Sequence, residues 1–369
     1  MVDDREIQEI DKLVATAKKA QEQYEANGSQ ELFDLACQAV GWALMQPENN
    51  SELSKLAVSE TGLGNVNDKI QKNHNKTLGL LRDIKNIKSF GHIYDDNLKG
   101  ISVYFRPKGV VAAIVPSTNP LATPTNNIIN ALKTGNSIII APSPKGAGPF
   151  AVLLKHIRKN LADVGINPDL VQMVTTPPSK SKTQRLMELA DLLVVTGSQN
   201  NVRAGYSSGT PALGVGQGNV VTILDETADV TDAAEKIAKS KTFDNATSCS
   251  SENSVIVVRS KYKEALDALE QAGGLILDEI ETQRVVNLHW QNGRMNTALL
   301  AKDINVIIDK TKLAHRSDKN TRFLILPTQE AGPDAIVSGE KMSQFLTLYL
   351  AEDFDHALKL AIKIQNYQG

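Results

Sequence analysis

Residues 110–120, VVAAIVPSTNP, join six consecutive apolar residues to a polar segment bounded by two prolines. An unbroken apolar run of this length is typical of a strand buried on both faces of a parallel sheet. Downstream, apolar strand-like runs at 137–140, 170–174 and 192–195 alternate with helix-like segments at 123–132, 149–161 and 179–189. This alternation, with short loops, predicts an α/β fold with a doubly wound parallel sheet.

The carboxyl ends of the first and last of these strands are the predicted ligand-binding places, because open α/β sheets bind ligands there. The first strand is followed by Ser117, Thr118 and Asn119, and the last by Gly197 and Ser198. The free N–H groups and the dipole of a helix that Gly197-Ser198 opens suit a phosphate group. Asn119 fits either a turn or a hydrogen-bond donor to a ligand.

The chain before residue 100 is predicted to be a helical cover that carries no chemistry. Apolar residues at helical spacing predict an amphipathic helix over residues 4–21, which Asn27-Gly28 would end. A second helix, from a Ser29 cap to about residue 45, is apolar on two sides and should bury Cys37 as a structural residue. More polar helices are expected to about residue 86.

Residues 241–258, KTFDNATSCSSENSVIVV, place the second cysteine, Cys249, among small polar residues. A helix capped by Thr231 is predicted before this run, and a buried strand is predicted over residues 254–258. In a polar loop between a helix and a strand, a thiol stays accessible and can be deprotonated, so Cys249 is a candidate nucleophile. The alternative is an incidental surface cysteine.

Two glycine-rich motifs have the wrong context for the functions that they suggest. Residues 205–209, GYSSG, match the nucleophile elbow of hydrolases around Ser207, but the elbow follows a strand and a helix is predicted here. Residues 214–218, GVGQG, have the wrong spacing for a dinucleotide fingerprint and precede the predicted strand at 220–224. Gly216 and Gly218 are expected in a tight loop that approaches a ligand, or in a structural turn.

The composition excludes several classes of protein. The 369 residues are 41% hydrophobic, which is enough for two domains, and the net charge of −2 gives no sign of a nucleic-acid or anionic-membrane partner. The apolar run at 110–115 is too short to span a bilayer, and the acidic start, MVDDREIQEID, does not resemble a signal peptide. Two cysteines and six scattered histidines predict neither a disulfide framework nor a metal site, so a reducing, cytoplasmic setting is expected.

Taken together, these segments resemble the CoA-acylating branch of the aldehyde dehydrogenase superfamily, from about Ala57 to the last residue. The segment GVVAAIVPSTNP resembles the family's strand and loop that carry the oxyanion asparagine, here Asn119, and VVTGSQN resembles the pyrophosphate-binding turn. GVGQGN is similar to the linker into the catalytic domain, and TFDNATSCSSENSVIV to the loop of the nucleophile, here Cys249. Glu340, in GEKMSQFL, matches the glutamate that holds the nicotinamide ribose.

The resemblance implies a cofactor domain over residues 1–224, a second α/β catalytic domain over residues 225–369, and a homodimer or homotetramer. NAD and NADP stay open, because Lys145 would meet an adenosine 2′-phosphate or be solvated. The cofactor-binding set implied by the resemblance is Ser117, Thr118, Ser143, Lys145, Gly197, Ser198, Gly216, Gly218 and Glu340.

Two departures from the family carry information, and a third is smaller. Val215 stands where hydrolytic members have the glutamate base for water, which favours the thiol of CoA as the acyl acceptor. The resemblance also stops at Gly369, where the family normally continues, so the C-terminal part of the catalytic domain is expected to be missing. Gln344 replaces a proline that is common in the family.

The expected reaction is a reversible oxidation of a small polar or anionic aldehyde through a thioester on Cys249. Hydroxyl groups on Thr247, Ser248 and Ser250 suit a small aldehyde that carries a polar or anionic group. The resemblance of the nucleophile loop to that of family members acting on sulfoacetaldehyde puts this substrate first, then succinate semialdehyde, then acetaldehyde. It is equally open that these hydroxyls only cap the local backbone. Two rival hypotheses are a serine hydrolase that uses Ser207 and a non-catalytic nucleotide-binding remnant.

Overall fold

The computed structural model describes residues 4–368 and divides them into two compact units. Unit 1 comprises residues 4–61 and 69–216, and unit 2 comprises residues 62–68 and 217–368. The division therefore falls before the boundary expected at 224/225, because strand β8 (Val220–Leu224) pairs with a strand of unit 2.

Unit 1 is built on a five-stranded parallel sheet, as predicted. Its strand order is β5-β4-β3-β6-β7, so the chain starts in the middle, fills one edge and then returns to fill the other. The strands are β3 (Val110–Val115), β4 (Ser137–Pro142), β5 (Val171–Met173), β6 (Leu192–Thr196) and β7 (Ala212–Val215). Strand β7, which the sequence analysis assigned in part to a glycine loop, completes the sheet beyond β6.

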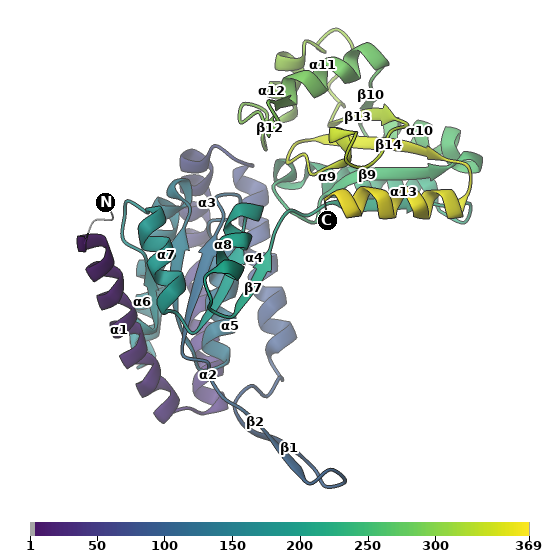
Figure 1. Ribbon diagram of the computed structural model, residues 1–369. Helices are drawn as coiled ribbons and strands as arrows, with labels where there is room; N and C mark the ends of the chain where they lie inside the picture. The colour runs from purple at the N-terminus through teal and green to yellow at the C-terminus, as the bar shows by residue number, and fades with distance from the viewer. Residues whose placement is uncertain (1–3, 369) are drawn as a thin grey trace. The chain divides into compact units, whose positions relative to one another are not determined.

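Helices cover both faces of this sheet (Figure 1). The side chains of β3 alternate between two cores, because successive residues of a strand point to opposite faces: Val111 packs with α2 and α5, and Ala112 packs with α1 and α7. The helices of this unit are α1 (Asp4–Ala26), α2 (Gln30–Met45), α3 (Pro47–Thr61), α4 (Val66–Ile84), α5 (Ala122–Lys133), α6 (Ala147–Asp163), α7 (Lys180–Leu189) and α8 (Gln199–Ser207).

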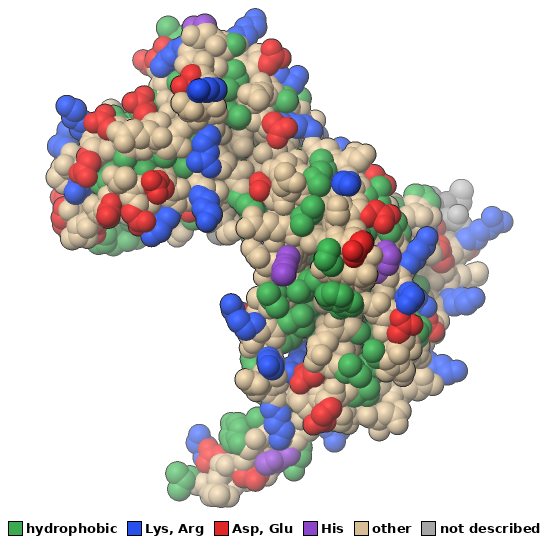
Figure 2. Space-filling model, turned by 180° about the vertical axis from the view of Figure 1, so that it is seen from behind, with side chains coloured by type: hydrophobic (Ala, Val, Ile, Leu, Met, Phe, Trp, Pro, Cys, Tyr) green, Lys and Arg blue, Asp and Glu red, His purple; other side chains and the backbone are tan. Residues whose placement is uncertain are grey.

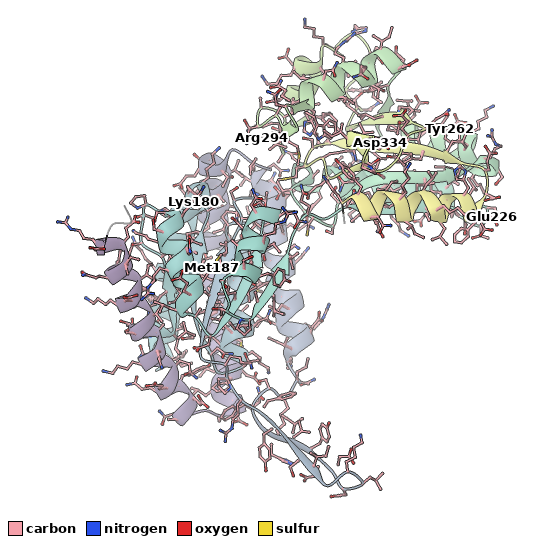
Figure 3. All side chains as sticks on the ribbon, in the orientation of Figure 1. Lys180, Met187, Glu226, Tyr262, Arg294 and Asp334 are labelled. Carbon is pink, nitrogen blue, oxygen red and sulfur yellow. The ribbon has the colours of Figure 1, made fainter. Side chains whose placement is uncertain are left out.

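Helix α7 illustrates how one face of each helix is buried. Lys180, its first residue, is exposed, whereas Met187 lies in the core between the helix and the sheet (Figure 3). Ser179 caps the helix by accepting a hydrogen bond from the Lys182 N–H.

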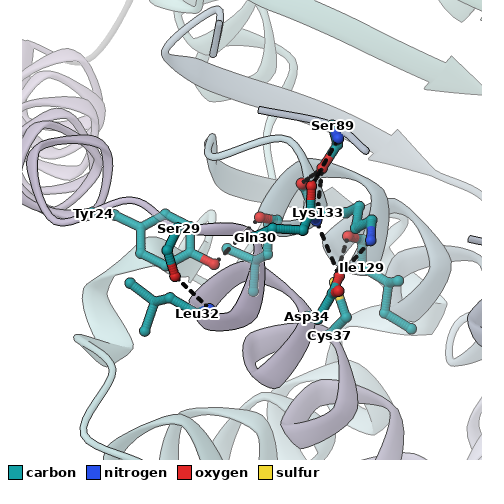
Figure 4. Close-up of polar contacts among 10 residues, drawn as sticks. Tyr24, Ser29, Gln30, Leu32, Asp34, Cys37, Ser89, Ile129 and Lys133 are labelled. Atoms are coloured by element: carbon teal, nitrogen blue, oxygen red, sulfur yellow. Dashed lines mark hydrogen bonds and ion pairs between the residues drawn. The ribbon is translucent and has the colours of Figure 1, made fainter. Parts of the chain in front are cut away.

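Cys37 is a structural residue, as predicted. It lies in α2, whose cap is Ser29, and its thiol donates to the Ile129 carbonyl of α5 at 3.4 Å (Figure 4). Burial raises the pKa of this thiol to about 12, so it stays protonated. The neighbouring ion pair between Lys133 and Asp34 ties the same two helices together.

A two-stranded antiparallel hairpin departs from unit 1 between the helical cover and the sheet. It consists of β1 (Gly91–Asp96) and β2 (Ile101–Phe105). Hydrophobic side chains gather on its surface (Figure 2), and Leu98 at its tip is fully exposed.

Unit 2 contains a second five-stranded parallel sheet, in the order β10-β13-β14-β9-β8. An α/β fold with two parallel sheets is therefore confirmed. The strands other than β8 are β9 (Glu252–Val258), β10 (Gly274–Ile276), β13 (Phe323–Thr328) and β14 (Phe345–Ala351), and β11 (Trp290–Gln291) and β12 (Arg294–Met295) form a small separate hairpin. The helices are α9 (Val230–Thr242), α10 (Tyr262–Gln271), α11 (Glu279–His289), α12 (Ile304–Thr311) and α13 (Phe354–Tyr367).

Two local predictions in unit 2 are corrected. Helix α9 is capped by Asp229, whose side chain accepts from the Asp232 N–H, and Thr231 lies within the helix. Asp and Thr are both good caps, and only the backbone conformation selects between them. Strand β9 begins at Glu252, earlier than the apolar run that predicted it. No helix within residues 4–368 is long and apolar enough to cross a membrane.

Candidate active site

The two ligand-binding places predicted in unit 1 lie side by side. Strands β3 and β6 are paired in parallel, so their carboxyl ends meet at one edge of the sheet. The chain leaves β3 through Ser117, Thr118 and Asn119 and leaves β6 through Gly197 and Ser198. The strand order changes direction between these two strands, and such a switch point is where doubly wound sheets bind ligands.

The turn after β6 is shaped by glycine and closed by a helix cap. Gly197 has a φ of 155°, and its N–H donates to the Val215 carbonyl at the end of β7. Ser198 caps α8 by accepting from the Asn201 N–H. A Cβ on Gly216 would lie 2.7 Å from the Gln199 side chain, so Gly216 packs directly on the start of α8.

The end of β4 adds a polar group to the same edge. The Ser143 N–H donates to the Val115 carbonyl, which holds the start of this loop against β3. The Ser143 hydroxyl is buried and has no hydrogen-bond partner among the described residues. Lys145, two residues on, is exposed.

Asn119 is oriented by a lysine that sequence analysis missed. The Nζ of Lys72, on α4, donates to the Asn119 amide oxygen at 3.1 Å. Because lysine can only donate, this contact directs the Asn119 oxygen toward Lys72 and its NH₂ group away. Lys72 is 2% exposed, and no local sequence signal links α4 to the loop after β3.

In unit 2, Cys249 is exposed on the loop between α9 and β9, as predicted. Three consecutive residues ahead of it, Asp244, Asn245 and Ala246, have left-handed φ values of 49°, 53° and 62°. Asp and Asn tolerate this conformation better than most residues, but Ala does not. Such strain persists only where surrounding contacts impose it, and it gathers at functional sites.

The contacts that impose this conformation start at Asp244. Its carboxylate accepts from the Asn65 N–H at 3.0 Å and from the Thr247 hydroxyl, and its own N–H donates to the Asp68 carboxylate at 2.7 Å. Residues 62–68 therefore act as a brace for the cysteine loop within unit 2.

Asn245 continues this network. Its amide donates to Asp303 at 2.9 Å, and its oxygen accepts from the Gln344 amide at 3.3 Å. The departure from the family at Gln344 thus supplies a hydrogen bond that a proline could not supply. Neither Asp244 nor Asn245 was singled out from the sequence, although an Asp-Asn pair before a nucleophile is compatible with a left-handed turn.

The hydroxyl groups near Cys249 have different surroundings. The Thr247 hydroxyl donates to Asp244, which supports the local structural role that was left open for it. The Ser248 carbonyl accepts from the Ser251 N–H, whereas Ser250 is exposed beside Cys249. The substrate-binding role of Thr247, Ser248 and Ser250 remains a prediction.

Gly218 lies directly against the cysteine loop. A Cβ on Gly218 would lie 2.4 Å from the Cys249 carbonyl oxygen, so only glycine fits. The Gly218 carbonyl accepts from the Asn253 amide at 3.4 Å, and its N–H donates to the Glu340 carboxylate. Cys249, Gly218 and Glu340 thus form one connected cluster within unit 2.

Burial raises the pKa of Glu340 to about 7, and the charges of Lys241 and Lys341 and the Gly218 hydrogen bond partly oppose this rise.

The hydrolase motif has no matching geometry, because Ser207 is the last residue of α8 and does not follow a strand. Within residues 4–368, no group of three or more His, Cys, Asp or Glu side chains is arranged to hold a metal ion.

Two parallel sheets, a topological switch point in one and an exposed thiol on a loop before a strand of the other define a two-domain α/β protein. Residues 2–275 match the aldehyde dehydrogenase family, and the chain belongs to that family.

Known proteins resemble this chain in sequence and in structure. A sulfoacetaldehyde dehydrogenase (acylating) from Cupriavidus necator is 48% identical over 97% of this chain and 72% of its own length. The crystal structure of an acetylating aldehyde dehydrogenase from Geobacillus thermoglucosidasius superposes with a TM-score of 0.93 at 32% identity, over 100% of this chain and 81% of that one. A propionaldehyde dehydrogenase from Rhodopseudomonas palustris, solved with bound CoA and an acylated cysteine, has a TM-score of 0.84 at 27% identity, over 96% and 80% of the two chains.

Proposed function

We propose that this protein is a CoA-acylating aldehyde dehydrogenase that oxidises a small polar or anionic aldehyde with NAD or NADP. The observation that carries the proposal is the exposed Cys249 on a loop whose strained backbone is held by Asp244 and Asn245. Sulfoacetaldehyde is the first candidate substrate, supported by the 48% identity to the Cupriavidus necator enzyme. Succinate semialdehyde and acetaldehyde are the alternatives.

In this mechanism the Cys249 thiolate attacks the aldehyde carbonyl. The Asn119 amide and the Cys249 N–H donate to the developing oxyanion, which is the main electrostatic contribution in acyl-transfer sites. Lys72 supports this role because it directs the Asn119 NH₂ group away from itself. A nicotinamide cofactor held by this protein would supply the hydride acceptor, and Cys249 would keep the acyl group as a thioester until the thiol of CoA displaces it.

We propose that residues at the sheet edge of unit 1 bind the cofactor, and Glu340 stays the residue that the family resemblance predicts for the nicotinamide ribose. Ser117, Thr118, Gly197 and Ser198 are proposed to hold the phosphates, since Gly197 and Ser198 lead into the N-terminus of α8, whose dipole favours negative charge. The unpartnered Ser143 hydroxyl supports a further polar contact. Gly216 and Gly218 stay predictions as cofactor contacts, since the room left by their missing Cβ atoms is taken by the Gln199 side chain and the Cys249 carbonyl. Lys145 is proposed to distinguish NADP from NAD.

The acceptor is proposed to be CoA and not water. Val215, at the end of β7, offers no base to activate water, whereas a thiol needs much less activation. The thioester on Cys249 would therefore persist until CoA arrives.

The protein is proposed to form a homodimer or homotetramer in the cytoplasm. The hairpin β1–β2 supports the assembly, because Tyr94, Leu98, Ile101 and Tyr104 are each more than half exposed. An apolar surface on a protruding hairpin is expected to be covered by another subunit. Two free thiols, one of them the proposed nucleophile, suit a reducing compartment.

The test is the reduction of NAD⁺ and NADP⁺ by the purified protein with each of the three aldehydes, with and without CoA. Sustained turnover only with CoA, and a burst of about one equivalent without it, are expected. Cys249→Ala should abolish both while leaving cofactor affinity unchanged. Turnover by that variant would refute the mechanism. Aldehyde-independent esterase activity lost in Ser207→Ala would instead favour the hydrolase, and cofactor binding without acylation of Cys249 would favour a binding remnant.

A further inference from the structure

The cysteine loop ends at a buried asparagine that the proposed mechanism does not use. Asn253 is the second residue of β9, and only 3% of its surface is exposed. Its two neighbours in β9 pair with the consecutive residues Val220 and Val221 of β8, so the ladder passes over Asn253. A residue inserted into a strand in this way re-aims its side chain, and such bulges are frequent beside active sites.

The Asn253 carboxamide has hydrogen-bond partners on both sides. Its oxygen accepts from the Lys341 N–H at 3.1 Å, and its NH₂ group donates to the Gly218 and Ser251 carbonyls, each at 3.4 Å. A backbone N–H can only donate and a carbonyl oxygen can only accept, so this orientation of the amide satisfies all three groups. Asn253 therefore joins three segments: the glycine loop before β8, the end of the cysteine loop and the segment before β14.

The segments that Asn253 joins also surround the backbone of the nucleophile. Cys249 lies in a turn that is closed by a hydrogen bond from the Ser251 N–H to the Ser248 carbonyl at 3.0 Å. Gly218 packs on the Cys249 carbonyl so closely that a Cβ does not fit. Because Asn253 binds the carbonyls of Ser251 and Gly218 together, it fixes the exit of the turn against the glycine that touches Cys249.

The glycine loop has its own anchor. Asn219, next to Gly218, is 5% exposed, and its amide donates to the Ser338 and Gln368 carbonyls, both at 2.8 Å. These hydrogen bonds hold the glycine loop whether or not the cysteine turn is in place. Gly218 is thus a fixed point to which Asn253 ties the turn.

We propose that Asn253 is a positioning residue for Cys249, which places the thiol for attack on the aldehyde by tying the cysteine turn to Gly218 and Lys341. The inference deepens the proposed function and rests on it, because it concerns the step that forms the thioester. Without these hydrogen bonds the turn is free to shift, and a displacement of about 1 Å costs about a hundredfold in the rate of such a step.

The first experiment compares the whole protein with Asn253→Leu by amide hydrogen exchange. Leucine has nearly the size of asparagine but makes none of the three hydrogen bonds. The amides of residues 248–252 should exchange about tenfold faster in the variant, as expected when about one net hydrogen bond of local stability is lost. Asn287→Leu, at an exposed residue of α11, is the matched control and should leave this exchange unchanged. Unchanged exchange in Asn253→Leu would overturn the inference.

The second experiment measures the burst of nicotinamide reduction with saturating sulfoacetaldehyde and without CoA. The burst should be about a hundredfold slower in Asn253→Leu, with the dissociation constant of NAD⁺ unchanged. Alkylation of Cys249 by iodoacetamide should persist, because the thiol stays exposed. A burst at the ordinary rate would contradict a positioning role. Cofactor affinity that falls in the same proportion as the rate would show that Asn253 only supports the fold.

Asn253→Asp is the second variant, and it serves where Asn253→Leu does not fold. The new carboxyl can still accept from the Lys341 N–H, but it can donate to a carbonyl only while it is protonated. Its burst should therefore fall further behind that of the unaltered protein as the pH rises from 6 to 9. A ratio of the two rates that is constant with pH would show that the donated hydrogen bonds play no part.

Failure of the inference and failure of the proposed function give different results. If the unaltered protein shows no burst with any of the three aldehydes, the proposed function fails, and hydrogen exchange still decides whether Asn253 holds the loop. If the unaltered protein shows a burst that both Asn253 variants match, only the role of Asn253 fails.

Discussion

At the scale of single residues, the accessibility of Cys249 and the position of its backbone have separate causes. The polar neighbours keep the thiol at the surface, whereas the left-handed turn at Asp244–Ala246 and the close approach of Gly218 set the direction of the loop. Catalysis by positioning depends on such contacts, since a displacement of about 1 Å can cost about a hundredfold in rate.

Gly218→Ala is expected to lower kcat/KM for aldehyde oxidation by about a hundredfold, because the new Cβ would meet the Cys249 carbonyl at 2.4 Å and displace the loop. Steady-state kinetics and thermal unfolding would be measured together. The matched control is Gly79→Ala in α4, where a Cβ meets nothing within 4 Å and where alanine favours the helix. Equal kinetics for Gly218→Ala and the unaltered protein would contradict the assigned contact.

At the scale of elements, strand β7 carries Val215, the residue that we propose favours CoA over water as the acceptor. Val215 and Leu213 lie two residues apart on one face of this strand, and both are exposed. The strand therefore offers a test site and a control site in nearly the same environment.

Val215→Glu should introduce hydrolysis of the Cys249 thioester, seen as sustained nicotinamide reduction without CoA. A carboxylate acting as a general base contributes about 10²- to 10⁴-fold, which is enough to turn a single burst into turnover. Leu213→Glu adds the same charge on the same strand and should retain the CoA requirement. If both variants behave alike, Val215 is not at the position of the missing base.

The hairpin β1–β2 is the second element with a distinct prediction. Tyr104→Glu combined with Ile101→Glu places charges on its apolar surface and should shift the protein toward the monomer in analytical ultracentrifugation. Val164→Glu, at a partly exposed apolar residue after α6, serves as the surface control. An unchanged sedimentation coefficient in the hairpin variant would show that another surface forms the assembly.

At the scale of the whole molecule, buried ionisable groups of unit 2 link stability to pH in opposite directions. His289 has its pKa lowered to about 4 by burial, so the unfolded chain binds the proton first as the pH falls from about 6.5. The contribution of neutral His289 to the free energy of unfolding is therefore fully present above pH 6.5 and is lost as the pH falls to about 4. The raised pKa of Glu340 has the opposite effect on the free energy of unfolding. Its carboxyl takes up a proton more readily in the folded state, so this group adds stability as the pH falls from about 7 to 4.5.

His289→Phe should therefore flatten the fall in the free energy of unfolding between pH 6.5 and pH 4, by up to about 3 kcal/mol. Phenylalanine keeps the edge-on contacts with Trp290 and Phe345, so the comparison concerns the slope rather than the absolute stability. Urea unfolding at several pH values provides the measurement, and the Glu340 contribution is common to both proteins. His315→Phe, at an exposed histidine, should leave the slope unchanged.

The sequence by itself determined the parallel sheet of unit 1, the buried Cys37 and the exposed loop of Cys249, because each follows from local periodicity or composition. Tertiary structure alone decided which distant residues act on the site. Lys72 reaches Asn119 from α4, and residues 62–68 brace Asp244. Contacts between segments far apart in the chain leave no local pattern. They arise only when packing brings together groups whose charges and hydrogen bonds cannot be left unsatisfied away from water.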